Sequence, residues 1–178
     1  MTAQRQERNG RSSGKAGRPG IALITGLALL LLLSVAVPTG LPSAQASTTE
    51  RVVVNRFSGL AIEGFDPVAY FTDAQAMLGR EEFEASQAGA VWRFRNAGNR
   101  ASFIAHPDIY GPQFGGYDPI DLARGVTVAG NPRFWLVSGQ RLYLFSREQS
   151  RDAFAAAAAS VLRKATARWP GLEQSLAE

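Results

Sequence analysis

The chain contains no cysteine and only one histidine, His106, among its 178 residues. The absence of cysteine excludes disulfides, thiolate metal sites, iron–sulfur clusters and a cysteine nucleophile. None of Ser58, Ser102, Ser138 and Ser146 lies in a Gly-x-Ser-x-Gly segment, so serine hydrolase chemistry has no support in the predicted domain either. Hydrophobic residues make up 46% of the chain, which is too many for a disordered protein and predicts one folded domain.

The net charge of +4 does not belong to the whole chain, because residues 1–46 hold five basic residues and one acidic residue. The remainder has fourteen basic and fourteen acidic residues and is formally neutral. Phosphate contacts need a surplus of Lys and Arg. We therefore expect no nucleic-acid partner.

The first 46 residues have the order of a secretory signal peptide. Basic residues from Arg5 to Arg18 precede the apolar run 21–37, and small residues in 43–46 predict cleavage after Ala46. The alternative is an uncleaved anchor formed by residues 21–37, since this mainly apolar segment of 17 residues falls just short of a bilayer span of about 20. Both alternatives place the following domain outside the cytoplasm, in the periplasm or the extracellular space.

Beyond the leader, the sequence predicts a linker over residues 47–58, a folded domain over 59–170 and a C-terminal tail over 171–178. Two hairpins are expected, over 82–95 with a turn at 87–89 and over 134–145 with a turn at 138–140. No repeat with a period of 20 to 50 residues is visible.

Helix signals complete the prediction. Asn96 is a candidate N-cap for a short helix that Pro107 ends, and Ser146 with Gln149 forms a candidate capping box for a last helix that ends near Arg168, before Pro170. The predicted fold class is α+β, with a small antiparallel sheet of hairpins, short helices and a C-terminal helix packed on one side.

Polar and aromatic residues gather in loops shaped by glycine and proline, where binding residues are often found. We therefore expect a non-enzymatic binding module for a small molecule or an exported protein, with no catalytic residue and no cofactor. The candidate ligand-binding residues are Asp66, Tyr70, Gln113, Phe114, Gly115, Gly116, Tyr117 and Asp118.

Two alternatives stay open. Asp66, His106, Asp118 and Asp121 could supply oxygen and nitrogen ligands to a metal ion, although turn formation explains each Asp-Pro pair without a metal. The other alternative is a membrane-tethered assembly factor, which requires the uncleaved leader.

Three spaced segments, Gly64–Phe71, Gly89–Phe94 and Asn99–Tyr110, resemble the YHS domain. The continuation Pro112–Tyr117 resembles the exported branch of YHS domain-containing (seleno)proteins, and the likeness runs from about Gly59 to Trp169. The resemblance implies a small α+β fold with a short antiparallel sheet and helices on one side.

The resemblance does not carry over the family's cysteine chemistry. Metal-binding members of the wider family have cysteines at the positions of Ala69, Arg95 and Asn99, and the exported branch commonly has cysteine or selenocysteine at the position of Asp118. None of these residues replaces a thiolate. The chain therefore resembles a redox-silent member of that branch.

We predict that the product recovered from an exporting host begins at Ser47, because the small residues before it suit a signal peptidase. Intact mass spectrometry checks this. A mass equal to that of the full chain would instead establish the uncleaved anchor.

Overall fold

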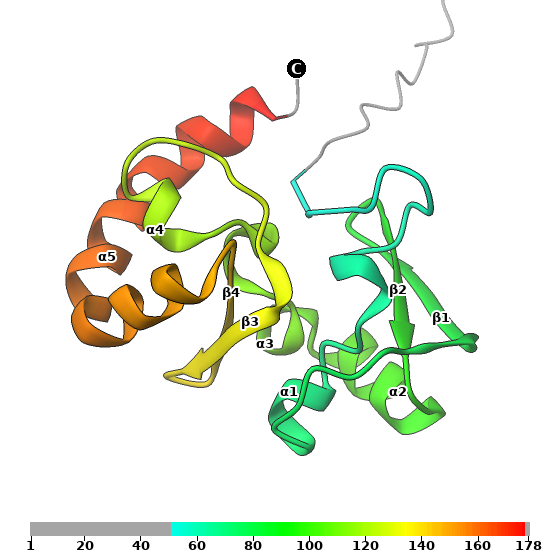
Figure 1. Ribbon diagram of the computed structural model, residues 1–178. Coiled ribbons are helices and arrows are strands. Elements are labelled where there is room, and N and C mark those ends of the chain that lie inside the picture. Colours follow the sequence, from blue (N-terminus) through cyan, green and yellow to red (C-terminus); the bar gives the residue numbers. More distant parts are fainter. Residues whose placement is uncertain (1–50, 177–178) are drawn as a thin grey trace, which may run out of the picture. The chain divides into compact units, whose positions relative to one another are not determined.

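The computed structural model describes residues 51–176, which belong to one of the two units into which the chain divides, residues 44–178 (Figure 1). The predicted leader and its cleavage site lie outside the described residues. Within residues 51–176, no helix is long and apolar enough to span a membrane.

Two antiparallel hairpins form the β-structure. One joins β1 (Arg80–Gln87) to β2 (Ala90–Phe94), and the other joins β3 (Asn131–Ser138) to β4 (Arg141–Phe145). Both turns have two central residues with positive φ, as two-residue hairpin turns require. The α+β class and both hairpins are confirmed, but the hairpins form two separate two-stranded sheets.

Seven helices surround the hairpins among the described residues: η1 (Ile62–Gly64), α1 (Ala69–Thr72), α2 (Ala97–Ala105), α3 (Pro107–Tyr110), η2 (Gln113–Gly116), α4 (Pro119–Leu122) and α5 (Glu148–Ser175). The predicted N-cap is confirmed, because the side chain of Asn96 accepts a hydrogen bond from the backbone N–H of Asn99 at 2.8 Å. Pro107 ends α2 and begins α3.

The elements occur twice in the same order, as a 3-10 helix, a short helix, a hairpin and a further helix. We call residues 60–105 the first repeat and residues 112–156 the second repeat. Arg80 pairs with Phe94, as Asn131 pairs with Phe145, and each hairpin has its register shift directly after that pair. The two repeats are therefore offset by 51 or 52 residues. This offset is slightly longer than the periods of 20 to 50 residues at which the sequence shows no repeat.

The two repeats also share their backbone conformation at equivalent positions. Residues 62–64 and 114–116 all have positive φ, and the isolated bridge of Phe65 with Leu78 corresponds to that of Tyr117 with Ala129. The identical residues at these turns are Gly, Asp and Pro around an aromatic position, in 64–67 and 116–119. Such a short match explains why the sequence alone did not reveal the duplication.

The hydrophobic core joins the two repeats. Its largest cluster combines Trp92, Phe94 and Phe103 of the first repeat with Leu142 and Leu144 of the second. Trp92 and Phe94 share the buried face of β2, as the alternation of the strand predicts.

Helix α5 differs from the prediction at both ends. Its N-cap is Arg147 rather than a capping box at Ser146, whose hydroxyl donates to Asp118 instead. The helix also continues beyond Pro170 to Ser175, because Leu172 and Leu176 pack against the cluster formed by Tyr117, Leu122 and Ala165.

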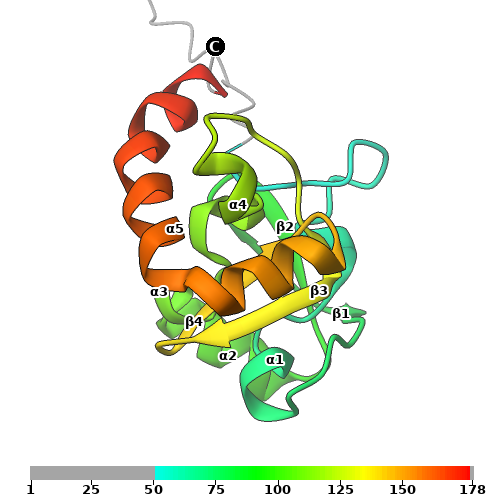
Figure 2. The same cartoon turned by 60° about the vertical axis from the view of Figure 1, so that its left-hand side comes forward.

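A bend at Ala157 divides α5 into two arms, which Figure 1 shows in orange and red. Ala157 corresponds to His106, where the first repeat breaks between α2 and α3 with a similar φ of −140°. The first arm is therefore the counterpart of α2. The second arm, residues 158–175, is an addition that lies beside α4 (Figure 2).

The duplication yields a matched pair of substitutions. Gly115 and Glu63 occupy equivalent positions with φ of 62° and 55°, but a Cβ at Gly115 would overlap the carbonyl oxygen of Arg51. We expect Gly115→Ala to lower the free energy of unfolding by about 2 kcal/mol in urea denaturation. Glu63→Gly is expected to be neutral or stabilising by up to about 1 kcal/mol, because glycine tolerates positive φ. Equal effects of the two changes would contradict this account.

Candidate functional site

Asp66 is completely buried and accepts three hydrogen bonds. Its Oδ1 accepts the N–H of Val68 at 2.8 Å, and its Oδ2 accepts the N–H of Arg95 at 2.8 Å and Nδ2 of Asn99 at 2.7 Å. The carboxylate thus joins the segment before α1 to the residue after β2. It organises the first repeat and exposes no surface to solvent, so the structure gives its role in ligand binding no support and that role stays a prediction.

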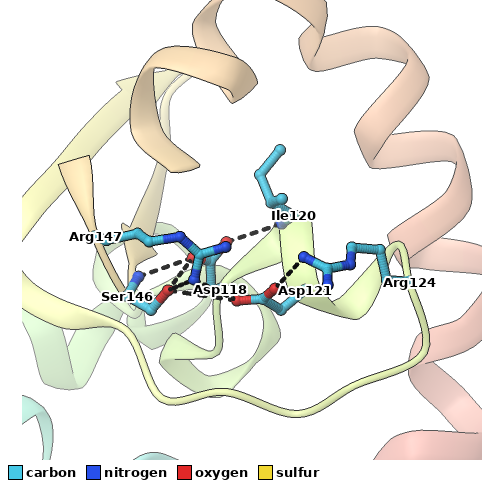
Figure 3. Close-up of polar contacts among 6 residues, drawn as sticks. All are labelled: Asp118, Ile120, Asp121, Arg124, Ser146 and Arg147. Atoms are coloured by element: carbon cyan, nitrogen blue, oxygen red, sulfur yellow. Dashed lines mark hydrogen bonds and ion pairs between the residues drawn. The ribbon is translucent and has the colours of Figure 1, made fainter. Parts of the chain in front are cut away.

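Asp118 performs the same task in the second repeat and is also completely buried (Figure 3). Its Oδ1 accepts the N–H of Ile120 at 2.9 Å, and its Oδ2 accepts the N–H and the hydroxyl of Ser146, each at 2.8 Å. Ser146 is the counterpart of Arg95. Asp118 is therefore bonded within the second repeat in the same way, and its role in ligand binding stays a prediction.

Tyr70, Gly116 and Tyr117 are buried as well. The hydroxyl of Tyr70 donates to the carbonyl of Pro132 at 2.9 Å, and its ring packs edge-on against Trp135. Burial, with the nearby charge of Asp66, raises the pKa of Tyr70, so the phenol remains protonated as the donor of this bond. Tyr70 connects the two repeats rather than lining a site.

Asp121 lies in a polar cluster specific to the second repeat (Figure 3). Its carboxylate is nearly buried and pairs with Arg124 at 3.1 Å and Arg147 at 3.5 Å. The corresponding residue of the first repeat is Ala69. Two guanidinium groups already offset the charge of Asp121, which makes this cluster a poor site for a cation.

The four predicted metal ligands are not assembled into one site. Asp118 and Asp121 lie together around Ser146, whereas His106 is exposed between α2 and α3. Among residues 51–176 there is no group of three or more His, Asp or Glu side chains that could hold a metal ion.

An open cavity of about 460 Å³ lies beside the predicted loop. Its aromatic lining consists of the half-buried Trp169 of the second arm of α5 and of Trp92 and Phe103 of the first repeat, which are almost completely buried in the core and form the base of the cavity. The indole N–H of Trp92 donates to the carbonyl of Gln87 at 3.0 Å, so the polar tip of this ring is already satisfied.

Polar residues of the cavity come from three separate segments: Arg51, Gln87 and Glu173. Trp169 and Glu173 are one helical turn apart and so share a face of α5. The segment that carries Arg51 is held by the N–H of Val53, which donates to the carbonyl of Gly115 at 2.8 Å.

Of the candidate ligand residues, Gly115 is the one that lines this cavity. Phe114 supports it indirectly by packing edge-on against Trp169, and Gln113 is half-buried in η2. Sequence reasoning missed Phe103 and Trp169 as site residues. No local signal in the sequence places these two residues beside one cavity.

Comparison with protein-family models, with curated proteins and with solved structures gives no match for this chain.

The buried carboxylates provide a direct test of their structural role. We expect Asp66→Ala and Asp118→Ala each to lower the free energy of unfolding by about 3 kcal/mol, because each change leaves buried donors without an acceptor. Asp152→Ala is the matched control, since Asp152 is exposed and pairs with Arg151 at the surface. Chemical denaturation followed by circular dichroism measures all three, and a loss below 1 kcal/mol for both buried positions would refute the role.

Proposed function

We propose that the chain is an exported, YHS-like binding module that holds a small aromatic or apolar molecule in the cavity between the first repeat and the second arm of α5. The observation that carries the proposal is the aromatic lining by Trp92, Phe103 and Trp169. Small-molecule sites are concave, are lined mainly by apolar and aromatic side chains, and commonly enclose about 300–1,000 Å³. The cavity volume of about 460 Å³ lies within that range.

The lining suits binding rather than a covalent reaction. Two prolines, Pro107 and Pro112, complete the apolar wall, and they fix the backbone on either side of α3. Arg51 and Glu173 offer opposite charges that would orient a polar group on the ligand. No nucleophile paired with a base belongs to this set.

The location of the cavity also supports a role in binding. Its walls come from the segment at residues 51–52, the β1–β2 turn, α2 and the end of α5, which are far apart in the sequence. Occupation by a ligand would therefore link the two repeats and the added arm, and would stabilise the folded state in proportion to its concentration.

A neutral fluorescent probe tests the site. We expect N-phenyl-1-naphthylamine to bind saturably and one to one, and Trp169→Ala to weaken binding at least about tenfold because an aromatic wall is lost. Trp135→Phe is the matched control, because Trp135 packs against Tyr70 and does not line the cavity. Thermal melts establish that each variant is folded at the temperature of the titration.

One outcome of this titration would refute the site. If the folded Trp169→Ala variant binds the probe as tightly as the unmodified protein, the cavity is not the binding site.

A further inference from the structure

Three arginine side chains line an open hollow of about 490 Å³ that is separate from the aromatic cavity. Arg80 begins β1, Arg95 directly follows β2, and Arg133 belongs to β3 of the second repeat. The chain is formally neutral beyond its leader, so this is a local gathering of positive charge rather than a consequence of composition.

None of these three guanidinium groups forms an ion pair with a carboxylate of residues 51–176. Nη1 of Arg95 donates a hydrogen bond to Sδ of Met77, which leaves the other nitrogens of that guanidinium group for a ligand. The acidic residues Glu81 and Glu84 of the same hairpin pair with Arg93 instead, at 3.2 Å and 2.7 Å. Like charges around one hollow repel each other, and an anion bound among them would relieve that repulsion.

The hollow also has an apolar side. Phe65, Met77 and Leu78 contribute to its lining, and the guanidinium carbon of Arg133 lies 5.8 Å from the centre of the Phe65 ring. Leu78 is 61% exposed, although it is a large hydrophobic residue. An apolar group of a ligand could cover it and remove that surface from water.

The framework of the hollow is fixed by backbone hydrogen bonds. The N–H of Asp66 donates to the carbonyl of Met77 at 2.8 Å, and the N–H of Gly79 donates to the carbonyl of Gly64 at 2.9 Å. The bond from Tyr70 to Pro132 places Arg133, the next residue, against the first repeat. The backbone around the hollow is therefore ordered before a ligand binds, which lowers the entropy cost of binding.

The second repeat serves as an internal comparison. The positions that correspond to Arg80 and Arg95 are Asn131 and Ser146, so the same scaffold forms without arginine at either place. Ser146 is engaged with Asp118. The arginines are consequently an addition to the first repeat and not a requirement of the fold.

We propose that this hollow binds a small amphipathic oxyanion, with its charged group held by Arg80, Arg95 and Arg133 and its apolar part lying against Met77 and Leu78. The planar fork of an arginine side chain matches the oxygens of a carboxylate or a phosphate monoester. A volume of about 490 Å³ suits a small molecule. The site is independent of the aromatic cavity, so either could be refuted without the other.

Four probes test the chemistry on the protein recovered from an exporting host. Octanoate and octyl phosphate carry both groups, acetate carries only the anion, and 1-octanol carries only the chain. We expect at least one of the two amphipathic anions to bind at least about tenfold more tightly than acetate and 1-octanol in isothermal titration calorimetry. The preference between octanoate and octyl phosphate identifies the oxyanion, whereas failure of both to exceed the single-group probes would overturn the proposal.

Variants locate the binding. We expect Arg80→Gln and Arg133→Gln each to weaken the preferred probe about tenfold, since each removes a charge-assisted hydrogen bond. Arg163→Gln, an exposed position on α5 outside the hollow, removes the same charge and is expected to change nothing. Binding of N-phenyl-1-naphthylamine should be equal in all three variants.

Amide chemical shifts distinguish the two sites directly. The proposal requires the largest changes at residues 75–80, 95 and 133 on addition of the preferred probe. Changes centred on residues 103 and 169 instead, together with unaltered affinity in Arg80→Gln and Arg133→Gln, would assign the probe to the aromatic cavity and overturn the arginine site.

Discussion

A carboxylate buried between a short helix and the end of a hairpin is the constraint on which each repeat depends. Burial of an ionised carboxylate costs several kcal/mol unless hydrogen bonds compensate for the lost water. Asp66 and Asp118 each accept three such bonds, from the residue two positions later and from the segment that follows the hairpin. These bonds hold the positive-φ turn, the short helix and the hairpin in one arrangement, so the surrounding residues are free to differ between the repeats.

Because residues around the two buried carboxylates can differ, the two repeats carry different side chains on their surfaces. Asp121 with its two arginine partners occupies the second repeat, where the first has Ala69. Arg80 and Arg95, which form no ion pair among the described residues, belong to the first repeat, where the second has Asn131 and Ser146. The added arm of α5 covers Tyr117 and Leu122 of the second repeat. The aromatic cavity exists because this arm also places Trp169 near Trp92 and Phe103 of the first repeat.

Local signals allowed the hairpins, their turns and the Asn96 cap to be predicted, because each depends on residues close in the sequence. The end of α5 was not predictable from Pro170, since the helix continues through the packing of Leu172 and Leu176, which is a tertiary effect. Asp66 and Asp118 looked like loop residues available to a ligand, but their partners Arg95 and Ser146 lie about 30 residues away. The position of Phe103 and Trp169 at one cavity likewise has no local signature.

One side-chain hydrogen bond between the repeats has no counterpart in the opposite direction, and this bond fixes the position of Arg133 in the arginine hollow. Tyr70 crosses from the first repeat to Pro132 of the second, whereas its counterpart in the second repeat, Leu122, has no hydroxyl to return such a bond. Because burial raises the pKa of Tyr70, neutral and moderately alkaline pH leave this donor intact. The bond therefore holds Arg133 beside Phe65 under the same conditions in which a carboxylate or phosphate ligand is negatively charged, and the proposed binding would need no rearrangement of one repeat against the other.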